Sequence, residues 1–429
     1  MKYLKSRYIG CAFLFTAVVF TTSCNKEYLN PNASTADEVL VSLKGLTGVT
    51  VGLQKTYSTS RAGLLYAGIT LNGLTTNEMI SINTGNTNEE RLVVGGVQVD
   101  GDNTIVGNVW TNANKIIYDA DHVIKNAANL PDKNYAAGLI AHASIFKALA
   151  LGNLAEYWER IPAGTGKNVQ FVARLDGLNK AIATIDNALA VIAANAISAT
   201  FLGNIPSGID IPNTLNALKA RYALFAGNYT MALAAANAVD LTKKSTLTYD
   251  ALNLNPVFEI ATSTNNVIQP KNLNLGQTGA NVPDLGDGRI PFYTVVNTTV
   301  RIKGFGDATF APIPVYLPGE IMLIKAEAYA RQTIPDLNNS LIELNKVVTK
   351  NNDIFGVNAN LPSLTGPYTQ SELLGLIYKH RCIELFMSGL KLEDMRRFNQ
   401  PLTDRKRNFF PYPSQERDNN PNTPANPAF

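Results

Sequence analysis

Residues 215–239 constrain the fold more than any other part of the sequence, because they predict two short helices joined by a tight turn. The apolar and small positions of the first helix are Leu218, Ala220, Tyr222, Ala223 and Phe225. Gly227-Asn228-Tyr229 predicts the turn, and the second helix begins with the apolar positions Ala232, Leu233, Ala235 and Ala236. Small side chains let two antiparallel helices lie close together. One hairpin cannot bury its apolar face alone, so further helices must pack against it.

Helical periodicity also marks other parts of the chain, and some of these segments are rich in small residues such as Gly152. The predicted helices are residues 112–129, 134–155, 179–194, 318–331 and 337–350. Paired helices of this kind are typical of tetratricopeptide-like repeats, which stack into a continuous scaffold. We therefore predict a mainly α-helical fold with tetratricopeptide-like hairpins, long irregular loops and few short strands.

Three segments interrupt the helical pattern. Residues 83–108 are rich in Gly, Asn and Thr and predict a loop with a short strand near Leu92–Val99. Residues 241–315 form a longer insertion, with a possible strand at Tyr293–Val296, and residues 355–367 form a third irregular segment. Long irregular segments in a compact protein are often functional, so we expect the insertion at 241–315 to lie on the ligand side.

The first 24 residues have the composition of an export signal. Lys2, Lys5 and Arg7 precede the apolar run Ile9–Phe20, and small residues then lead to Cys24. This order predicts a lipoprotein signal peptide over residues 1–23, cleaved before Cys24, which is then lipidated. An ordinary secretory signal with an incidental cysteine is the alternative. No later stretch reaches about 18 uninterrupted apolar residues, so we expect the mature chain to be anchored and not to span the membrane.

The domain organisation follows from this signal. Residues 24–36 are polar after the lipidated cysteine and predict a tether, and residues 37–429 predict a single domain that begins with a helix at Asp37. Removal of the signal and lipidation of Cys24 leave Cys382 as the one other cysteine of the mature chain. We therefore expect no intrachain disulfide and a buried, unreactive Cys382.

Composition and motifs argue against several functional classes. The net charge is +3, and no basic run is interleaved with aromatic residues, so nothing indicates nucleic-acid binding. His122, His142 and His380 lack a metal-ligand spacing, and neither a Gly-x-Ser-x-Gly elbow nor a Walker loop is present. We therefore expect a binding protein without a metal, a cofactor or enzymatic activity.

The C-terminal part carries the most specific motifs. Thr369 and Glu372 predict a capping box at the start of a helix that runs to about Phe386 and ends at Gly389. Three segments resemble, in their order along the chain, the SusD/RagB family of outer-membrane nutrient-binding lipoproteins of the Bacteroidetes. They are the helix at Pro318–Tyr329 with its Ala-Glu-Ala, the stretch Tyr378–Phe398 and the closing Pro411–Glu416. The family pattern is matched at Arg381, Glu384, Leu385, Gly389, Asp394, Arg397 and Phe398.

Three departures make the chain resemble a divergent member of that family. His380 and Ser388 stand where the family usually has Glu, and Lys391 stands where it usually has Arg. A physical interpretation of the matched positions is structural. Arg381 and Glu384 are three residues apart and can pair on one helix, and Asp394, Arg396 and Arg397 can fix the short following helix to it.

The resemblance implies a function in nutrient capture. It implies a lipid-anchored protein of the outer membrane, facing the cell exterior, that captures an oligosaccharide for uptake through a SusC-like TonB-dependent transporter. A peptide-capturing RagB-like protein is the alternative that the family leaves open. A helical adaptor that binds only protein and a glycoside hydrolase, for which Glu89-Glu90 offers paired carboxylates, are the alternatives outside the family.

Loop aromatics are the candidate ligand contacts, because aromatic side chains can cover the apolar faces of sugars. We name Tyr66 near the first loop and Phe292, Tyr293 and Phe305 in the long insertion. Trp110 and Trp158 lie in helical or turn patterns that predict core packing instead.

Overall fold

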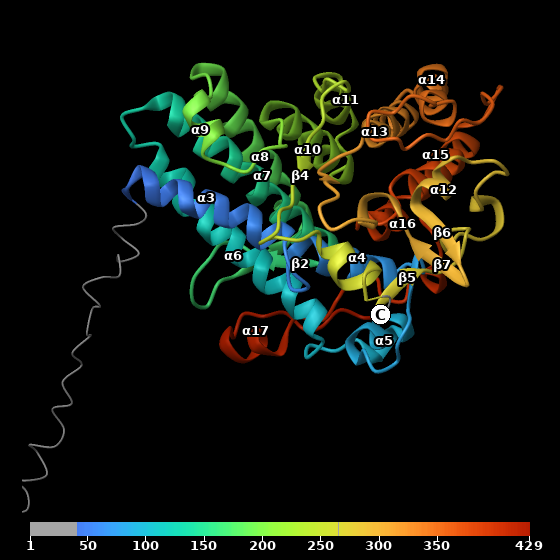
Figure 1. Cartoon of the computed structure of the whole chain (residues 1–429), viewed down its shortest axis with the longest axis horizontal. Helices are drawn as coiled ribbons and strands as arrows, with labels where there is room; N and C mark the ends of the chain where they lie inside the picture. The colour runs from blue at the N-terminus through green and yellow to red at the C-terminus, as the bar shows by residue number, and fades with distance from the viewer. Residues whose placement is uncertain (1–40, 265) are drawn as a thin grey trace, which may run out of the picture. The chain divides into compact units, whose positions relative to one another are not determined.

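The computed structural model describes residues 41–264 and 266–429, which belong to one compact unit (Figure 1). The predicted signal peptide, the lipidated Cys24, the tether at 24–36 and the helix start at Asp37 lie outside the described residues. The unit is mostly helical with few short strands, so the predicted fold class is confirmed.

The helices are distributed along the whole unit. In the first half they are α3 (Leu43–Ser58), α4 (Leu64–Thr75), α5 (Thr87–Val94), α6 (Thr104–Ala127), α7 (Lys133–Tyr157), α8 (Arg174–Ala194) and α9 (Ala199–Gly203). In the second half they are α10 (Ile211–Phe225), α11 (Tyr229–Asn237), α12 (Arg289–Tyr293), α13 (Pro318–Arg331), α14 (Leu337–Val348), α15 (Gln370–Glu384), α16 (Lys391–Arg397) and α17 (Ser414–Asn419).

The strands are short and form antiparallel pairs. These are β1 (Met79–Ser81) with β5 (Ile268–Pro270), β2 (Arg160–Pro162) with β3 (Phe171–Ala173), β4 (Thr246–Leu247) with β8 (Ile313–Pro314), and β6 (Thr294–Asn297) with β7 (Thr299–Ile302). Short turns of other helix types lie at η1 (Gly96–Gln98), η2 (Phe258–Thr262), η3 (Gly279–Asn281), η4 (Gly304–Gly306) and η5 (Leu402–Asp404). The predicted strand near 293–296 corresponds to β6.

Helical hairpins stack side by side, as the sequence predicts. The predicted hairpin at 215–239 is α10–α11, with Gly227 at a φ of +76° in the turn and the Asn228 side chain accepting from the Met231 N–H at 3.0 Å. Helix α10 packs against α8 and α7, and α11 packs against α13. Figure 1 shows the resulting row, which continues from α8 through α10 and α11 to the α13–α14 hairpin.

Helix α7 is the centre of the core. By length and apolar composition it could cross a membrane, but 94% of its apolar window is buried inside the protein. It packs against α3, α6, α8 and α10. Its glycines permit close packing, because a Cβ on Gly138 would lie 2.2 Å from the Phe201 ring and one on Gly152 would lie 2.3 Å from the Tyr222 ring. The long apolar helix α7 is therefore a buried core helix of this unit.

Two local predictions are wrong. Residues 92–99 form no strand: residues 87–94 are helical, since Glu89 and Glu90 occupy the first turn, where the helix dipole favours acids, and Gly95 ends the helix at a φ of +77°. Arg381 and Glu384 do not pair with each other. Arg381 Nε donates to Asp394 Oδ2 at 2.9 Å, whereas Glu384 contacts Arg289 and Lys350.

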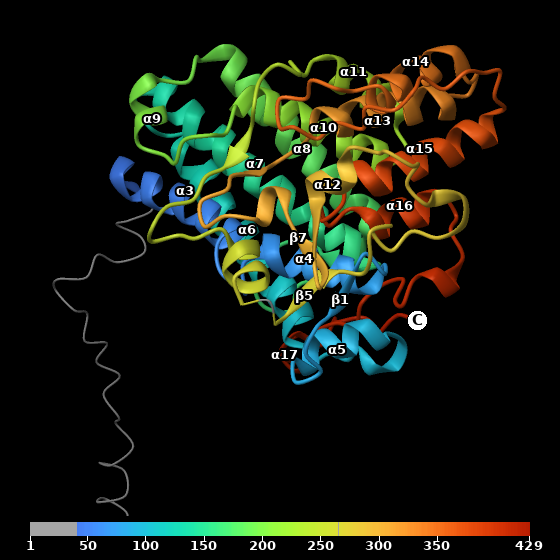
Figure 2. The ribbon, with the colours of Figure 1, turned by 45° about the vertical axis from the view of Figure 1, so that its right-hand side comes forward.

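The C-terminal segment returns to the N-terminal part of the unit (Figures 1 and 2). The Gly96 N–H donates to the Lys406 carbonyl at 2.8 Å, and the Phe410 N–H donates to the Tyr157 carbonyl at 2.9 Å. Trp158 Nε1 donates to the Pro411 carbonyl at 3.0 Å. Trp158 and Trp110 are both buried and packed edge to face, which agrees with the predicted core role.

Candidate functional site

A pocket of about 410 Å³ lies where α4, α5 and α6 begin, and we call it the Tyr66 pocket. Its lining residues are Arg61, Ala62, Tyr66, Ala67, Thr70, Gly85, Asn86, Thr87, Asn88, Glu89, Thr104, Ile105 and Asn108. A volume of this size falls in the range of small-molecule pockets, which is about 300–1,000 Å³. Apart from Tyr66, Ala62, Ala67 and Ile105, the lining is mostly polar.

Asparagine side chains hold these helix starts together. Asn103 caps α6 by accepting from the Ile105 N–H at 3.0 Å, and its amide donates to the Asn88 carbonyl at 3.0 Å. The Asn88 side-chain oxygen accepts from the Thr104 N–H at 3.1 Å. Because these bonds join Asn88 in the first turn of α5 to the start of α6, the two helix starts share one fixed arrangement.

Charge in the pocket is balanced. Arg61 forms an ion pair with Glu89, whose side chain is 2% exposed, while that of Arg61 is 48% exposed. The half-exposed guanidinium can therefore reach a ligand and still compensate the buried carboxylate. One cation and one anion leave the lining without net charge, which favours a neutral, hydroxyl-rich ligand over an ion.

One polar group of the pocket has capacity left for a ligand. The hydroxyls of Tyr66 and Thr70 are buried and interact with each other within α4. Burial raises the pKa of Tyr66, so its hydroxyl keeps its proton. The Asn108 amide, which can both donate and accept, makes no side-chain bond within the described part of the chain. Asn108 is only partly buried, so its amide is the uncommitted polar group of the lining that a ligand can reach.

The insertion aromatics lie together elsewhere. Phe292, Tyr293 and Phe305 form an edge-to-face cluster with ring centroids 5.0–6.3 Å apart. Phe386 and Phe355 extend it, and the Tyr293 hydroxyl donates to the Glu384 carbonyl at 2.6 Å. Tyr293 is buried, and Phe292 and Phe305 are partly buried. The structure thus brings these three predicted contacts together in a packed cluster. Tyr66 is not a loop aromatic as predicted: it lies in α4, is 1% exposed and lines the Tyr66 pocket from below its surface.

A cavity beside the aromatic cluster is small. Tyr293 and Phe305 line it together with Tyr57, Arg221 and Met387, and it holds about 70 Å³. This volume is well below the roughly 300 Å³ at which ligand pockets usually begin. Of the two cavities that predicted aromatic residues line, the Tyr66 pocket is therefore the better candidate for a ligand site.

The signature residues form a buried charge network behind the insertion. Arg289 is fully buried and contacts Asp287 at 2.7 Å and Glu384 at 3.2 Å. Its guanidinium also lies 2.9 Å from His380 Nδ1, and burial, followed by the positive charge of Arg289, holds the pKa of His380 well below its usual value. A neutral imidazole can accept a hydrogen bond from the Arg289 guanidinium. His380 can therefore act as a hydrogen-bond acceptor for Arg289.

The other signature residues join helices. Asp394 contacts Arg381 at 2.9 Å and also pairs with Arg397, which in turn contacts Glu327 of α13. Gly389 has a φ of +80° and its carbonyl accepts from the Asn72 amide at 2.6 Å. These residues join α16 to α15, α13 and α4.

Sequence reasoning missed Arg61, Asn88 and Asn108 as site residues. Single polar residues near helix starts carry no periodic pattern, and the pocket depends on three helices meeting in space. One signal is present in the sequence, namely the Asn-rich composition of residues 83–108, but that composition by itself predicts only a loop. Glu89 stands in the sequence as one of two adjacent carboxylates, and the structure pairs it with Arg61.

Comparison with known proteins shows the fold. No family model and no curated protein matches the chain. Among solved structures, a SusD superfamily protein from Parabacteroides distasonis is similar with a TM-score of 0.70 at 14% identity, covering 92% of this chain and 100% of that one. A SusD-like carbohydrate binding protein from Bacteroides fragilis has a TM-score of 0.69 at 15% identity, covering 90% and 99%.

A third similar structure carries both family names. A SusD/RagB family protein from Bacteroides thetaiotaomicron has a TM-score of 0.61 at 14% identity, covering 91% of this chain and 95% of that one. All three similarities extend over nearly the whole described unit, and all three identities are low. The chain therefore has the fold of the SusD/RagB structures, which is the fold that its motifs predict.

Proposed function

We propose that the protein captures a neutral oligosaccharide at the Tyr66 pocket and passes it to a SusC-like TonB-dependent transporter. The observation that carries this proposal is the polar, charge-balanced lining of a pocket of about 410 Å³. Sugar hydroxyls both donate and accept, and the pocket offers the Arg61 donors, the Glu89 acceptor and the Asn108 amide side by side. A carbohydrate binding protein among the structures of the same fold is consistent with this ligand class.

We further propose that the protein is anchored through Cys24 at the outer membrane and faces the cell exterior. The order of basic residues, apolar run and small residues before Cys24 supports the anchor. A binding protein at that surface needs no chemistry of its own, so we propose that it does not hydrolyse its ligand.

A titration with paired carboxylate variants tests the site. Purified protein is titrated calorimetrically with a panel of neutral oligosaccharides, and Glu89→Gln is compared with Glu90→Gln, its neighbour on α5 that does not line the pocket. Hydrogen bonds to a charged group are worth about 1.5–3 kcal/mol, so we expect Glu89→Gln to weaken binding by about 10–100-fold. Glu90→Gln should leave the affinity within about twofold.

The same samples show whether the protein binds its ligand without cleaving it. Intact ligand recovered after saturation supports the binding function, and shorter products would show a hydrolase instead. If no oligosaccharide binds, or if Glu89→Gln and Glu90→Gln bind equally well, the Tyr66 pocket is not the capture site.

A further inference from the structure

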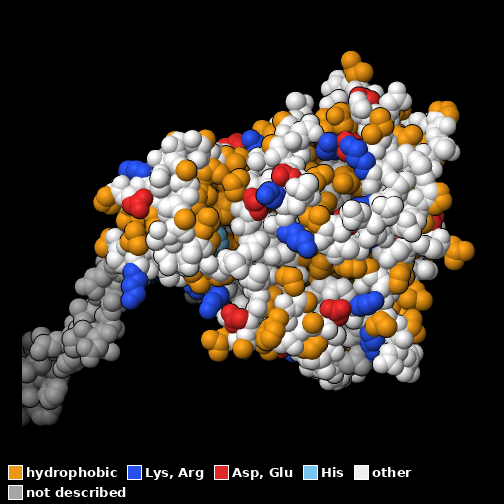
Figure 3. Space-filling model, turned by 45° about the horizontal axis from the view of Figure 1, so that its top comes forward, with side chains coloured by type: hydrophobic (Ala, Val, Ile, Leu, Met, Phe, Trp, Pro, Cys, Tyr) orange, Lys and Arg blue, Asp and Glu red, His pale blue; other side chains and the backbone are white. Residues whose placement is uncertain are grey.

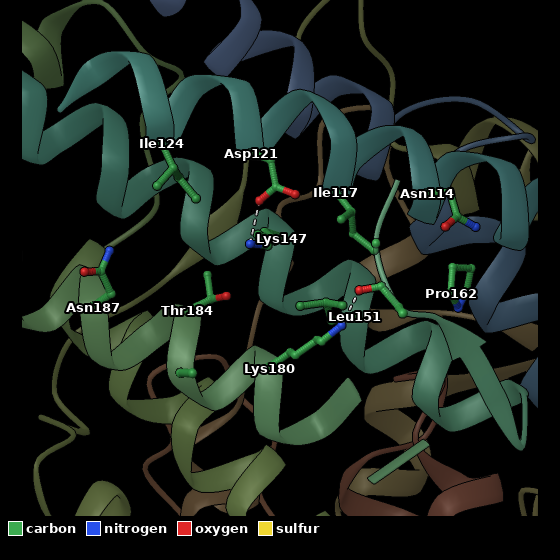
Figure 4. Close-up of a pocket in the computed structure, with 13 residues that line it drawn as sticks. Asn114, Ile117, Asp121, Ile124, Lys147, Leu151, Pro162, Lys180, Thr184 and Asn187 are labelled. Carbon is green, nitrogen blue, oxygen red and sulfur yellow. Dashed lines mark hydrogen bonds and ion pairs between the residues drawn. The ribbon is translucent and has the colours of Figure 1, made fainter. Parts of the chain in front are cut away.

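A second pocket, which shares no lining residue with the Tyr66 pocket, lies between α6 and α8 (Figure 4). We call it the α6–α8 trough. It holds about 430 Å³, with α6 and α8 as walls and Leu151 of α7 on the floor. On the α6 wall it runs from Asn114 to Ile124, and ten residues of helix correspond to about 15 Å. That length accommodates about four residues of an extended peptide, at roughly 3.4 Å per residue.

The floor and the α6 wall of the trough are aliphatic. Ile117, Ile124, Leu151 and Pro162 supply apolar surface, and no aromatic ring is among the described residues that line it. Such a floor suits the aliphatic side chains of a peptide and offers no flat ring on which a sugar could stack. The lining therefore differs in kind from that of the Tyr66 pocket.

The charges of the trough are not balanced. Lys147 Nζ lies 2.6 Å from Asp121 Oδ1, so these two charges compensate each other. Lys180 Nζ donates to the carbonyl oxygen of Ala163, a neutral group, and makes no ion pair with any described residue. Figure 4 shows Lys147 and Lys180 extending into the space between the two walls. The trough thus carries a net charge of +1, which is located at Lys180.

Neutral polar groups of the α8 wall are also free. The Thr184 hydroxyl and the Asn187 amide line the trough and make no hydrogen bond with the described residues. An extended backbone presents N–H and C=O groups alternately, and an Asn amide can satisfy one of each. Free amide and hydroxyl groups beside an aliphatic floor and an uncompensated ammonium are the contacts that an acidic peptide requires.

Figure 3 shows a face that lies between the front and the top of Figure 1, and no broad basic patch covers its described part. Lys and Arg side chains on the described part of this face stand in small groups, several of them beside Asp or Glu side chains. Recognition by a single placed ammonium, such as that of Lys180, fits this surface better than recognition by a broad basic patch would.

We propose that the α6–α8 trough binds a short, extended peptide segment that carries a carboxylate. The carboxylate contacts Lys180, the aliphatic side chains lie on Ile117 and Leu151, and the backbone bonds to Asn187. This site is separate from oligosaccharide capture and does not depend on it. It gives the protein a means of holding an acidic segment of a partner protein on its helical scaffold.

Two peptides that differ by one charge test the proposal. The probes are acetyl-Leu-Glu-Leu-Ala-amide and acetyl-Leu-Gln-Leu-Ala-amide, titrated into the purified protein. We expect the Glu peptide to bind at least about tenfold more tightly than the Gln peptide, since charge-assisted hydrogen bonds are about twice as strong as neutral ones. Lys180→Met should reduce the Glu peptide to the affinity of the Gln peptide.

The chain offers a matched control and a blocking variant. Lys133 Nζ also donates to a backbone carbonyl, that of Ala128 at 2.9 Å, but it lies outside the trough, so Lys133→Met should leave both affinities unchanged. Ala183 is exposed on the trough wall, and Ala183→Phe should reduce binding of both peptides at least about tenfold by filling the space. Equal binding of both peptides, undiminished binding by Lys180→Met, or no binding at all would overturn the proposal.

Discussion

His142 lies in the middle of α7 with both ring nitrogens buried and without a hydrogen bond to any described residue. Its ring packs against Phe146 at a centroid distance of 5.1 Å. Burial lowers the pKa of His142 to about 3, from an ordinary value of 6.5. The residue thus behaves as a neutral core side chain whose polar atoms destabilise the folded state.

The lowered pKa of His142 makes the free energy of unfolding depend on pH in one direction. Above pH 6.5 neither the folded nor the unfolded state binds this proton. Between pH 6.5 and about 3 only the unfolded state binds it, so the free energy of unfolding falls as pH falls, by up to about 1.4 kcal/mol per pH unit. His380, whose pKa is also lowered by burial, contributes in the same direction.

His142→Leu should therefore stabilise the protein and flatten its acid response. Removing two unpaired buried nitrogens is expected to raise the free energy of unfolding by about 1–3 kcal/mol at pH 7.5. The gain should increase towards pH 4, because the wild-type protein loses stability there and the variant loses less. Urea unfolding from pH 4 to 8 measures both effects. A variant that is less stable at every pH would show that His142 has a partner in solution.

At the scale of helices, the contact between α7 and α10 depends on the absence of one side chain. A Cβ on Gly152 would lie 2.3 Å from the buried Tyr222 ring, which cannot move without displacing α10. Gly107 in α6 provides the contrast, since a Cβ added there would meet no atom within 4 Å. Helix propensity alone favours Ala over Gly at both sites by about 1 kcal/mol.

Gly152→Ala and Gly107→Ala should therefore change stability in opposite directions. We expect Gly152→Ala to lower the free energy of unfolding by about 1–3 kcal/mol through overpacking. Gly107→Ala should raise it by roughly 0.5–1 kcal/mol, since it only restricts the unfolded chain. Thermal and urea unfolding of both variants measure these two changes in the free energy of unfolding. Stabilisation by Gly152→Ala would mean that the helices are free to move apart.

The helices themselves could be predicted from the sequence because their signals are local. The capping box at Thr369 and Glu372 forms as expected, and the turn at Gly227 separates α10 from α11. The sequence predicts that Asp394 fixes the following helix to that of Arg381, but it does not predict that Arg381 itself is the partner of Asp394. Of the Tyr66 pocket it predicts Tyr66 alone as a ligand contact, since the rest of the lining requires α4, α5 and α6 to start at one point in space.

At the scale of the whole molecule, two ion pairs join the long insertion to α15, and they differ in burial. Arg289 and Glu384 are both fully buried, at 3.2 Å. Lys379 and Asp284 lie 2.7 Å apart, but the Asp284 side chain is half exposed. A buried pair leaves an uncompensated charge when one partner is removed, whereas an exposed pair leaves a solvated one.

Arg289→Met should loosen the insertion and Lys379→Met should not. We expect Arg289→Met to lower the free energy of unfolding by about 3–5 kcal/mol, because Asp287 and Glu384 lose a shared buried partner. Lys379→Met should change it by less than about 1 kcal/mol. Urea unfolding gives both values, and hydrogen exchange over residues 279–303 shows whether the insertion opens locally. Equal effects of the two variants would contradict this difference.

The return of the C-terminal segment to the N-terminal helices determines when the fold can close. Lys406 Nζ bonds to the Leu74 carbonyl, 332 residues earlier. A ribosome adding roughly 5–20 residues per second needs about 15–65 s to cover that gap. Throughout that time α4 and the end of α7 lack the segment of chain that covers them, so the core cannot close while the protein is being made. The chain therefore cannot complete its fold until its last residues emerge. A protein that crosses a membrane before it folds must remain incompletely folded in the same way.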